Sequence, residues 1–423
     1  MKIGKEVQNK NWLVFSVLLI SVCIASTAFA QGLQTAVPEA VGLSSQRLNQ
    51  IDTVLKADID KGMIPGAVVL VARKGKIAYF KSFGMRDKEK GLPMEKDSIF
   101  RAYSMTKPLV GVAGAILLEE GKIVLNEPVA KYIPAFKDVQ VAVYGKNDAG
   151  KITRTLVKPK AVMTLHHLLT HTSGLSYGWS VPKPFQKEYY GVGLKSDWTI
   201  AEQCDALAKL PLQFHPGEKY MYSRSFDVMG RVLEVASGMP LDQLLKKRVY
   251  EPLGMPDTGF NVSQANQNRL VYMNPKTFLY IDFTKPRIRF GGGGDAVSTT
   301  MDFARFAQML LNGGQLDGKR LLGPRTVTYI TSDHLGSLGN RTDRAYTPGV
   351  GYGGGFGFYV RVDAGRSPFL GNVGEFYKGG YAETDFWVDP KEDLMAVFMM
   401  CEPAQRPRYR ILLKTLIYQA IVN

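Results

Sequence analysis

Hydrophobic and polar positions near the start of the chain predict a helix followed by a β-hairpin. Between residues 44 and 61, apolar side chains recur at helical spacing, and Ser44 and Ser45 are both of a type that caps helix N-termini. Two apolar, β-rich runs follow at residues 67–72 and 77–83, separated by the polar sequence Arg-Lys-Gly-Lys. This arrangement is typical of two antiparallel strands joined by a tight turn.

The centre of the chain has a mainly helical pattern. Residues 104–120 form a long segment rich in Ala, Val and Leu, which predicts a helix that is buried on most sides. From about residue 125 to residue 290, helices alternate with long loops that contain Pro and Gly, and the clearest helices are at residues 164–169 and 226–237. A further helix is predicted at residues 302–311.

Strand patterns return near the end of the chain. They are found at residues 355–362, 385–388 and 394–400, and an amphipathic helix follows at residues 409–422. Strands at both ends of a chain with a helical middle predict one discontinuous α/β domain. We therefore expect an α/β fold over residues 31–423, with a helical insertion at about residues 125–290.

The first segment of the chain, residues 1–30, has the features of a signal peptide. Three lysines precede an apolar run from residue 12 to residue 25, and Ala28-Phe29-Ala30 offers the small residues that a signal peptidase requires. The alternative is an uncleaved membrane anchor, because the apolar run approaches spanning length. The Ala-x-Ala ending favours cleavage, so we expect an exported protein, periplasmic or secreted, without stable membrane insertion.

Composition excludes several other classes of protein. The formal charge of +15 is spread along the chain, with no basic run interleaved with aromatics, so nucleic acid is not an expected partner. His166, His167 and His171 lie in one segment without a second group of ligands, so no metal site is expected. Outside the signal peptide, Cys204 and Cys401 remain, and we expect them to be buried free thiols.

The main candidate for chemistry is Ser104-Met105-Thr106-Lys107, at the start of the long apolar helix. Positions i and i+3 of a helix lie on one face, so the Lys107 amine can reach the Ser104 hydroxyl. A serine hydroxyl needs a base to become a good nucleophile, and a lysine in an apolar, electropositive site can be neutral enough to serve. Ser104 is therefore the predicted nucleophile and Lys107 its activating residue.

Two other segments match nucleophile motifs only superficially. Ser180 and Lys183 also have Ser-x-x-Lys spacing, but Pro182 lies between them and predicts a loop. Ser176 is the centre of a Gly-x-Ser-x-Gly match, a motif that requires a strand before it and a helix after it. Here the match follows a predicted helix, so Ser176 is the weaker candidate for the nucleophile.

Two further motifs follow the Ser104 motif along the chain, and their order makes the Ser-x-x-Lys match specific. A segment Pro-Gly-Glu-Lys-Tyr-Met-Tyr-Ser-Arg ends at Arg224, and Lys378-Gly379-Gly380 precedes a predicted strand. The order Ser-x-x-Lys, Tyr, Lys-x-Gly resembles that of class C β-lactamases, DD-peptidases and family VIII carboxylesterases. The segments at residues 164–175, 250–255 and 291–306 also look like hallmarks of this superfamily, and the resemblance spans about residues 38–420.

The resemblance implies a fold and a set of roles. It implies a β-lactamase-like α/β fold, in which an antiparallel sheet flanked by helices meets a helical region and the active site lies at their junction. Ser104 would be acylated, Lys107 and Tyr222 would share the role of base, and Tyr222 would protonate the leaving group. Lys378 would bias Tyr222 toward phenolate and meet any substrate carboxylate, unless it is merely a surface charge. No cofactor is implied.

The resemblance also implies an oxyanion hole and a specificity region. The backbone N–H groups of Ser104 and Tyr381 would stabilise the oxyanion. Three residues depart from the β-lactamase pattern: Arg224 replaces an asparagine, Glu383 replaces a small residue, and Tyr381 is unusually bulky. These departures suggest a reshaped acyl pocket, and Arg224 could instead recognise an acidic substrate.

Three functions remain open at this stage. The first is hydrolysis of carboxylic esters through an acyl-serine, which needs only the Ser–Lys–Tyr set and an oxyanion hole. The second is a β-lactamase or DD-peptidase, which Lys378 favours and Arg224 opposes; amide hydrolysis or acyl transfer on the same scaffold is a related option. The third is a catalytically silent protein that binds peptidoglycan or a β-lactam. The expected partner is a small-molecule ester or β-lactam, and the oligomeric state stays open.

Overall fold

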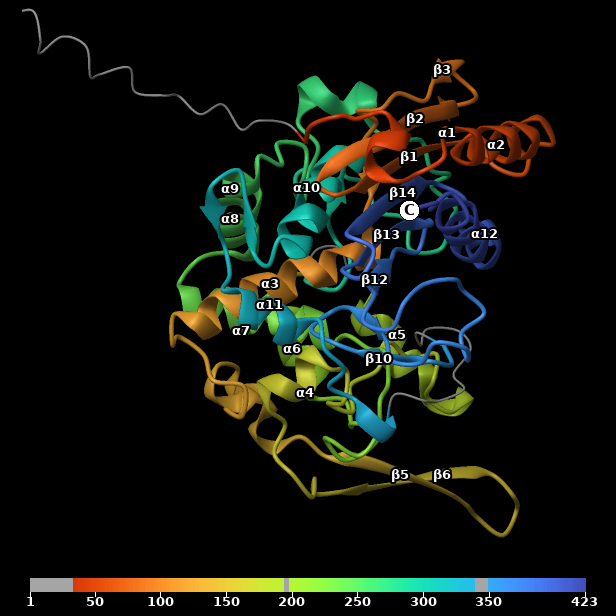
Figure 1. Ribbon diagram of the computed structural model, residues 1–423. Helices are drawn as coiled ribbons and strands as arrows, with labels where there is room; N and C mark the ends of the chain where they lie inside the picture. Colours follow the sequence, from red (N-terminus) through yellow and green to blue (C-terminus); the bar gives the residue numbers. More distant parts are fainter. Residues whose placement is uncertain (1–32, 194–197, 339–348) are drawn as a thin grey trace, which may run out of the picture. The chain divides into compact units, whose positions relative to one another are not determined.

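The computed structural model describes residues 33–193, 198–338 and 349–423. Its main feature is an eight-stranded antiparallel sheet with the strand order β10-β11-β12-β13-β14-β1-β2-β3. The N-terminal strand β1 (Gly66–Arg73) pairs directly with the last strand β14 (Leu394–Met400), so both ends of this unit share one sheet (Figure 1). This confirms the α/β fold that the sequence pattern predicts and the antiparallel sheet that the family resemblance implies.

The hairpin of β1 and β2 (Lys76–Asp87) follows from local sequence. Its two-residue turn, Lys74-Gly75, has φ values of 52° and 71°. Positive φ at both central positions matches the twist of antiparallel strands, and glycine adopts it without steric cost. The structure thus places the turn where the sequence predicts it.

Both faces of the central strands are buried, which explains their continuous apolar runs. In β1, Val68 and Leu70 face one core cluster, whereas Val69 and Val71 face another. Side chains alternate between the two faces of a strand, so a strand that is covered on both sides needs apolar residues at every position. A truncation such as Leu70→Ala would cost about 2–5 kcal/mol.

Helices cover the two faces of the sheet. On one face, α2 (Gln50–Asp60) packs beside α12 (Arg406–Tyr418) (Figure 1). On the other face, α10 (Thr300–Leu311) packs against β13 (Thr384–Asp389), β14 and β1. The side chains of α12 and α2 join the core of the first face, and those of α10 join the core of the second face.

The helical region is built around α3 (Thr106–Glu119) and α7 (Ser225–Ser237), which pack against each other. Buried residues occupy almost the whole length of α3, as its apolar sequence predicts. Around α7 lie α4 (Leu165–Leu169), α6 (Ile200–Ala208) and α8 (Leu241–Leu245). The remaining longer or paired elements are β3 (Leu92–Pro93), β4 (Phe100–Arg101), β5 (Val141–Lys146), β6 (Ile152–Val157), α5 (Gln186–Gly193), α9 (Glu251–Leu253), β7 (Val297–Ser298), β8 (Gln315–Leu316), β9 (Lys319–Arg320) and α11 (Pro324–Ile330).

Several predicted boundaries differ from the structure. The first predicted helix is two helices, α1 (Ser45–Leu48) and α2, and the Ser44 hydroxyl caps α1 by accepting the Arg47 N–H at 3.3 Å. The helix predicted at residues 409–422 begins three residues earlier, at Arg406. The predicted helical insertion also contains the β5–β6 hairpin, so it is not purely helical.

The strand predicted at residues 355–362 is wrong as a single strand. The structure has two short strands instead, β10 (Tyr352–Gly354) and β11 (Tyr359–Arg361), which pair with each other. Gly357 adopts a φ of 85°, outside the extended region, and this breaks the run into a hairpin. β12 (Phe376–Gly379) then pairs with β11 and carries the third motif into the sheet.

Other features relate to export and surface charge. The predicted signal peptide at residues 1–30 lies outside the described residues. No helix within the described residues is long and apolar enough to cross a membrane.

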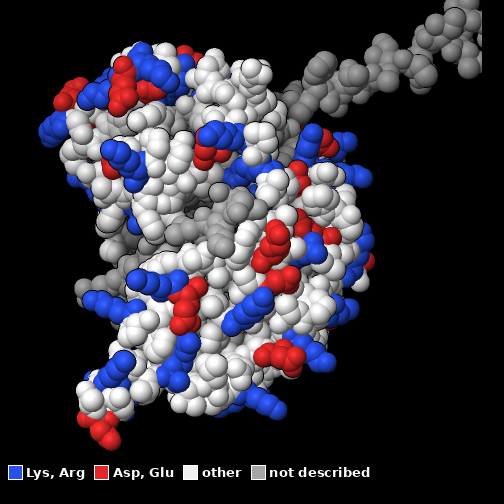
Figure 2. All heavy atoms as spheres, turned by 180° about the vertical axis from the view of Figure 1, so that it is seen from behind, with Lys and Arg blue, Asp and Glu red and all other residues white. Residues whose placement is uncertain are grey.

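On the face in Figure 2, basic and acidic side chains are interspersed. In the part of the chain that the structure describes, Cys204 is a buried free thiol and Cys401 a half-buried one, so they do not pair, as expected.

Candidate active site

Ser104 lies in a short 3₁₀ turn, Tyr103–Met105, that connects β4 to α3. The helix itself begins at Thr106, two residues later than a helix starting at Ser104 would. Tyr103 has a φ of 45°, which is unusual for a bulky residue. Strained backbone of this kind persists only where surrounding structure enforces it, and it is frequent at functional sites.

The Ser104 hydroxyl lies within reach of two predicted partners. The Tyr222 hydroxyl donates a hydrogen bond to Ser104 Oγ at 2.7 Å. The Lys107 amine donates to the same oxygen at 3.4 Å. The structure therefore brings together Ser104, Lys107 and Tyr222, although Tyr222 is 118 residues away from Ser104 in the sequence.

Lys107 is fully buried beneath the serine. Its amine also donates to the Tyr177 hydroxyl at 3.3 Å and to the Gly293 carbonyl. Burial lowers the pKa of Lys107 to about 7, with Asp227 opposing this shift and Arg224 adding to it. A lysine with such a pKa is neutral in a large fraction of molecules near neutral pH, as a general base requires.

Tyr222 is in contact with two lysines. The Lys107 amine and the Lys378 amine each lie 4.6 Å from the centre of the Tyr222 ring. Burial raises the pKa of Tyr222 above its ordinary value, and the hydrogen bond with Ser104 lowers it in part. At neutral pH Tyr222 is thus a protonated phenol and can donate a proton.

Lys378 is 1% exposed, so the alternative of a surface charge is wrong. Its amine packs on the rings of Tyr222 and Tyr359, the latter at 3.7 Å from the ring centre. Burial lowers the pKa of Lys378 well below its ordinary value, and the charge of Lys107 lowers it further. Lys378 is absent from the described residues that line the cavity beside Ser104, although both rings that it packs on belong to that lining.

Close packing requires glycine at position 380 of the third motif and leaves little space for a side chain at position 379. A Cβ on Gly380 would lie 2.2 Å from Thr384 Oγ1 and 2.5 Å from the Ala102 carbonyl oxygen. A Cβ on Gly379 would lie 2.4 Å from a nitrogen of the Arg410 guanidinium. Glycine therefore lets this turn pack directly against the segment that leads into Ser104.

The two peptides that the resemblance assigns to the oxyanion hole are each held through their carbonyl groups. The Thr106 hydroxyl donates to the Tyr103 carbonyl at 2.7 Å, and that peptide carries the Ser104 N–H. The Arg410 guanidinium donates to the Gly380 carbonyl at 3.3 Å, and that peptide carries the Tyr381 N–H. A hydrogen bond to the carbonyl fixes the orientation of a peptide and polarises its N–H.

Ser104 opens into a cavity of about 1280 Å³. This is larger than the range of about 300–1000 Å³ that is common for small-molecule sites. Aromatic side chains provide much of its wall, and they are Tyr103, Tyr177, Trp179, Tyr190, Tyr222, Phe278, Tyr280, Tyr359, Phe369, Tyr377 and Tyr381. The cavity suits a bulky, mainly apolar ligand.

The three departures from the β-lactamase pattern have different positions. Arg224 and Tyr381 line the cavity, as a reshaped acyl pocket requires. Glu383 does not line it; its carboxylate is fully buried and pairs with Arg410 at 3.2 Å. The expectation that Glu383 belongs to the wall of the acyl pocket is therefore wrong, because its carboxyl group lies against Arg410 behind the third motif.

The two superficial motif matches have structural contacts instead. Ser176 is 2% exposed, and its hydroxyl accepts the Gly178 N–H at 2.9 Å within a turn. Ser180 contacts Ser176 and Met221, and Lys183 begins a separate 3₁₀ turn. Ser180 and Lys183 thus do not share a helix face, which agrees with the interpretation of that match as a loop.

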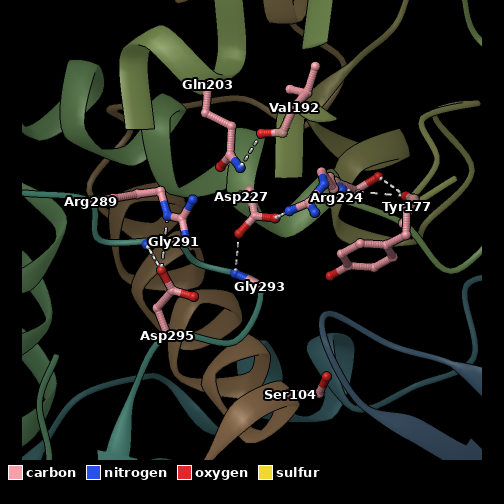
Figure 3. A network of polar contacts seen from close by, with 12 residues as sticks. Ser104, Tyr177, Val192, Gln203, Arg224, Asp227, Arg289, Gly291, Gly293 and Asp295 are labelled. Atoms are coloured by element: carbon pink, nitrogen blue, oxygen red, sulfur yellow. Dashed lines mark hydrogen bonds and ion pairs between the residues drawn. The ribbon is translucent and has the colours of Figure 1, made fainter. Parts of the chain in front are cut away.

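Sequence analysis missed three residues that contact Lys107 or its neighbours. They are Tyr177, Gly293 and Asp227, whose carboxylate accepts the Gly293 N–H at 2.8 Å (Figure 3). The run of glycines at residues 291–294 indicated a turn and belonged to a segment that resembles the superfamily, but it did not indicate a contact with Lys107. A Cβ on Gly293 would lie 2.7 Å from the Asp227 carboxylate, so glycine is needed for this contact.

The site contains no obvious place for a metal ion. Within the described ranges, no group of three or more His, Cys, Asp or Glu side chains is arranged to hold one. His166 instead faces His334, with 3.4 Å between ring nitrogens, and burial lowers the pKa of His166 to about 4.

The fold and the grouping of these side chains define a hydrolase of β-lactamase fold. The chain belongs to the Beta-lactamase family, whose model matches residues 51–416. Over 356 residues it is 35% identical to an uncharacterised protein of Mycobacterium tuberculosis, covering 81% of this chain and 86% of that one. It is also 35% identical over 241 residues to the esterase EstB of Burkholderia gladioli, covering 56% and 57% of the two chains.

A solved structure resembles the fold closely. EstCE1, described as a hydrolase with promiscuous acyltransferase activity, has a TM-score of 0.73 and 26% sequence identity to this chain. The similarity covers 88% of this chain and 99% of EstCE1. The sequence-based recognition of the β-lactamase-related superfamily is thereby confirmed.

Proposed function

We propose that this protein hydrolyses carboxylic esters through a covalent acyl-Ser104 intermediate. The observation that carries the proposal is the position of Ser104 Oγ, 2.7 Å from the Tyr222 hydroxyl and 3.4 Å from the Lys107 amine. Lys107, with a pKa of about 7, serves as the general base, and Tyr222, with a raised pKa, serves as the proton donor. Similarity to an esterase supports the choice of ester.

Acylation begins when neutral Lys107 takes the proton of Ser104 Oγ. The oxygen bonds to the ester carbonyl carbon, and the N–H groups of Ser104 and Tyr381 stabilise the oxyanion. The bond between carbon and the alcohol oxygen then breaks, Tyr222 gives its proton to the departing alcohol, and Lys107 restores the proton of Tyr222. The products of this half-reaction are a neutral alcohol and the acyl-Ser104 ester.

Deacylation repeats the same proton movements with water. Water gives a proton to Lys107 as its oxygen bonds to the acyl carbon. The bond to Ser104 Oγ then breaks, and the serine regains a proton through Tyr222, which is again reprotonated from Lys107. A carboxylic acid leaves, and the net reaction consumes one ester and one water.

The position of Lys378 disfavours the β-lactamase or DD-peptidase alternative. Lys378 is buried against Tyr222 and Tyr359 and is not itself among the described residues that line the cavity, and Arg224 occupies the wall where a substrate amide would need an asparagine. Acyl transfer to an alcohol is the second candidate, because the large aromatic cavity can admit an acceptor and EstCE1 is described as having such activity. A silent binding protein would not need the pKa of Lys107 to be near 7.

Initial rates on a p-nitrophenyl ester and on a chromogenic cephalosporin test the proposal, with Ser104→Ala alongside. We expect fast ester cleavage, little cephalosporin turnover and loss of both in the variant. Comparable cephalosporin turnover would favour the β-lactamase alternative, and acylation without turnover would favour the binding protein. Ester cleavage that survives Ser104→Ala would refute the assignment of the nucleophile.

We further propose that the protein acts outside the cytoplasm on a small-molecule ester. The signal-like segment at residues 1–30 supports export. Sequencing the N-terminus of the mature secreted protein tests this, and a new N-terminus near Gln31 is the expected result.

A further inference from the structure

The cavity beside Ser104 has an excess of basic side chains on its wall. Among the described residues, seven basic side chains line it and only three acidic ones do. The basic side chains are Arg224, Lys285, Arg287, Arg289, Arg366, Arg406 and Arg410, and the acidic ones are Asp227, Asp282 and Asp295. This imbalance favours an anionic ligand, since charges at low-dielectric walls interact more strongly than in water.

One carboxylate on this wall serves two arginines. Asp295 Oδ2 lies 2.7 Å from Arg287 Nη2 and 3.4 Å from Arg289 Nε, and it also accepts the Gly291 N–H at 3.1 Å (Figure 3). One carboxylate thus contacts both guanidinium groups. The side chain of Arg287 is only 10% exposed, and burial lowers its pKa, which reflects the cost of this charge.

Two guanidinium nitrogens of this wall lack an acceptor. In the described part of the chain, Arg287 Nη1 and Arg224 Nε are buried without a hydrogen-bond partner. Arg224 makes a long ion pair with Asp227, at 3.4 Å, and its guanidinium lies 4.9 Å from the centre of the Tyr177 ring. A buried N–H without an acceptor is costly, so it indicates a place where a ligand acceptor would be stabilising.

The two arginines belong to neighbouring parts of one wall. A Cβ on Gly291 would lie 2.8 Å from Asp295 Oδ2 and 2.9 Å from Asp227 Oδ1, so the two carboxylates flank the same glycine. Figure 3 shows Asp227 and Asp295 beside this glycine loop, and both aspartates line the same cavity as Ser104. An anion against this wall can therefore be part of a molecule whose ester group reaches Ser104.

We propose that Arg224 and Arg287 form a subsite for a carboxylate carried by the ester substrate. The subsite rests on the proposed esterase function and specifies its substrate class: esters with a bulky, mainly apolar body and a carboxylate remote from the scissile bond. Both side chains line the cavity, so their guanidinium groups are placed to donate to such a carboxylate. Lys378 is not available for this contact, because it packs behind Tyr222.

Two pairs of matched esters test the subsite. In one pair, mono-p-nitrophenyl adipate is compared with the p-nitrophenyl ester of its primary amide, so the anion is on the acyl chain. In the other pair, para-acetoxyphenylacetate is compared with its primary amide, so the anion is on the alcohol portion. The measured quantity is the ratio of kcat/KM for the carboxylate to kcat/KM for the amide, which cancels general losses of folding or nucleophile strength.

In the wild type, the ratio should be about 10 in at least one pair, as expected for a hydrogen bond between charged groups. Arg287→Gln and Arg224→Gln should each lower that ratio severalfold. If Arg287→Gln does not fold, Arg224→Gln still tests the subsite, because it leaves the ion pairs of Asp295 in place. Lys285→Gln is the matched control, because Lys285 lines the same cavity but its side chain is 78% exposed and pairs with Asp282. Its ratio should equal that of the wild type.

Three results would overturn the subsite. They are a wild-type ratio near unity in both pairs, an unchanged ratio in both arginine variants, or an equal fall in Lys285→Gln. An equal fall in Lys285→Gln would mean that the summed positive charge of the cavity wall attracts the anion, and not a specific contact with the two arginines. If the enzyme cleaves the esters that carry a primary amide as fast as the esters that carry a carboxylate, only the subsite proposal fails. If Ser104→Ala leaves the cleavage of all four esters unchanged, the proposed function itself fails.

Discussion

The pH dependence of ester cleavage should report the ionisation of Lys107. Lys107 can accept the Ser104 proton only in its neutral form, which predominates above its pKa of about 7. The value of kcat/KM should therefore rise with pH to about 7 and level off above it. An unperturbed lysine, by contrast, would give a rate that still rises at pH about 10.

Asp227 and Arg224 should move this profile in opposite directions. The negative charge of Asp227 raises the pKa of Lys107, and the positive charge of Arg224 lowers it. Asp227→Asn should thus shift the rising limb to lower pH, and Arg224→Gln should shift it to higher pH. Asparagine keeps an oxygen that can still accept the Gly293 N–H, so the geometry of the loop is retained.

The size of the Asp227 effect follows from the contacts. Asp227 Oδ1 is 2.8 Å from the Gly293 nitrogen, and the carbonyl of the same glycine accepts the Lys107 amine. The two charges are therefore within roughly 9 Å of each other. With an effective dielectric constant of about 20, their interaction is about 2 kcal/mol, so removing the charge should shift the pKa by roughly one unit.

The assay is kcat/KM for p-nitrophenyl butyrate, an uncharged ester, across pH about 5 to about 9. The double variant Arg224→Gln with Asp227→Asn is the matched control, and its limb should return close to that of the wild type. A limb that stays fixed in both single variants, or that moves the same way in both, would refute the assignment of this ionisation to Lys107.

Three further predictions concern the same site. Tyr222→Phe should lower kcat by ~10²–10⁴-fold with little change in KM, because it removes the proton donor to the leaving alcohol; a kcat near that of the wild type would exclude this role. Ser176→Ala should keep the wild-type kcat in the same assay, since its hydroxyl only caps a turn, and a loss as large as that of Ser104→Ala would reverse the choice of nucleophile. Gly380→Ala should lower kcat by roughly 10²-fold, because the added Cβ would clash with Thr384 Oγ1 and displace the Tyr381 N–H. Thermal unfolding of the same variant separates this effect from general instability.

Local sequence determined the parts of this protein that depend on short-range geometry. The strands β1 and β14 follow from their continuous apolar, β-rich runs, and the β1–β2 turn follows from the positive φ that Lys74-Gly75 can adopt. The Ser104–Lys107 pair follows from the spacing of one helical turn. The choice of Tyr222 also came from the sequence, through the superfamily resemblance, since periodicity alone cannot relate residues 118 positions apart.

The tertiary structure decided the environment of each of these groups. Burial beneath Ser104 brings the pKa of Lys107 to about 7, and packing on Tyr222 and Tyr359 buries Lys378, which sequence analysis left open as a surface charge. Glu383 was expected in the pocket but faces Arg410 instead. The desolvation of Lys107 and its contacts with Tyr177 and Gly293 depend on groups that converge from separate segments. No short window of sequence contains that information, because these contacts form only when the sheet and the helical region have packed.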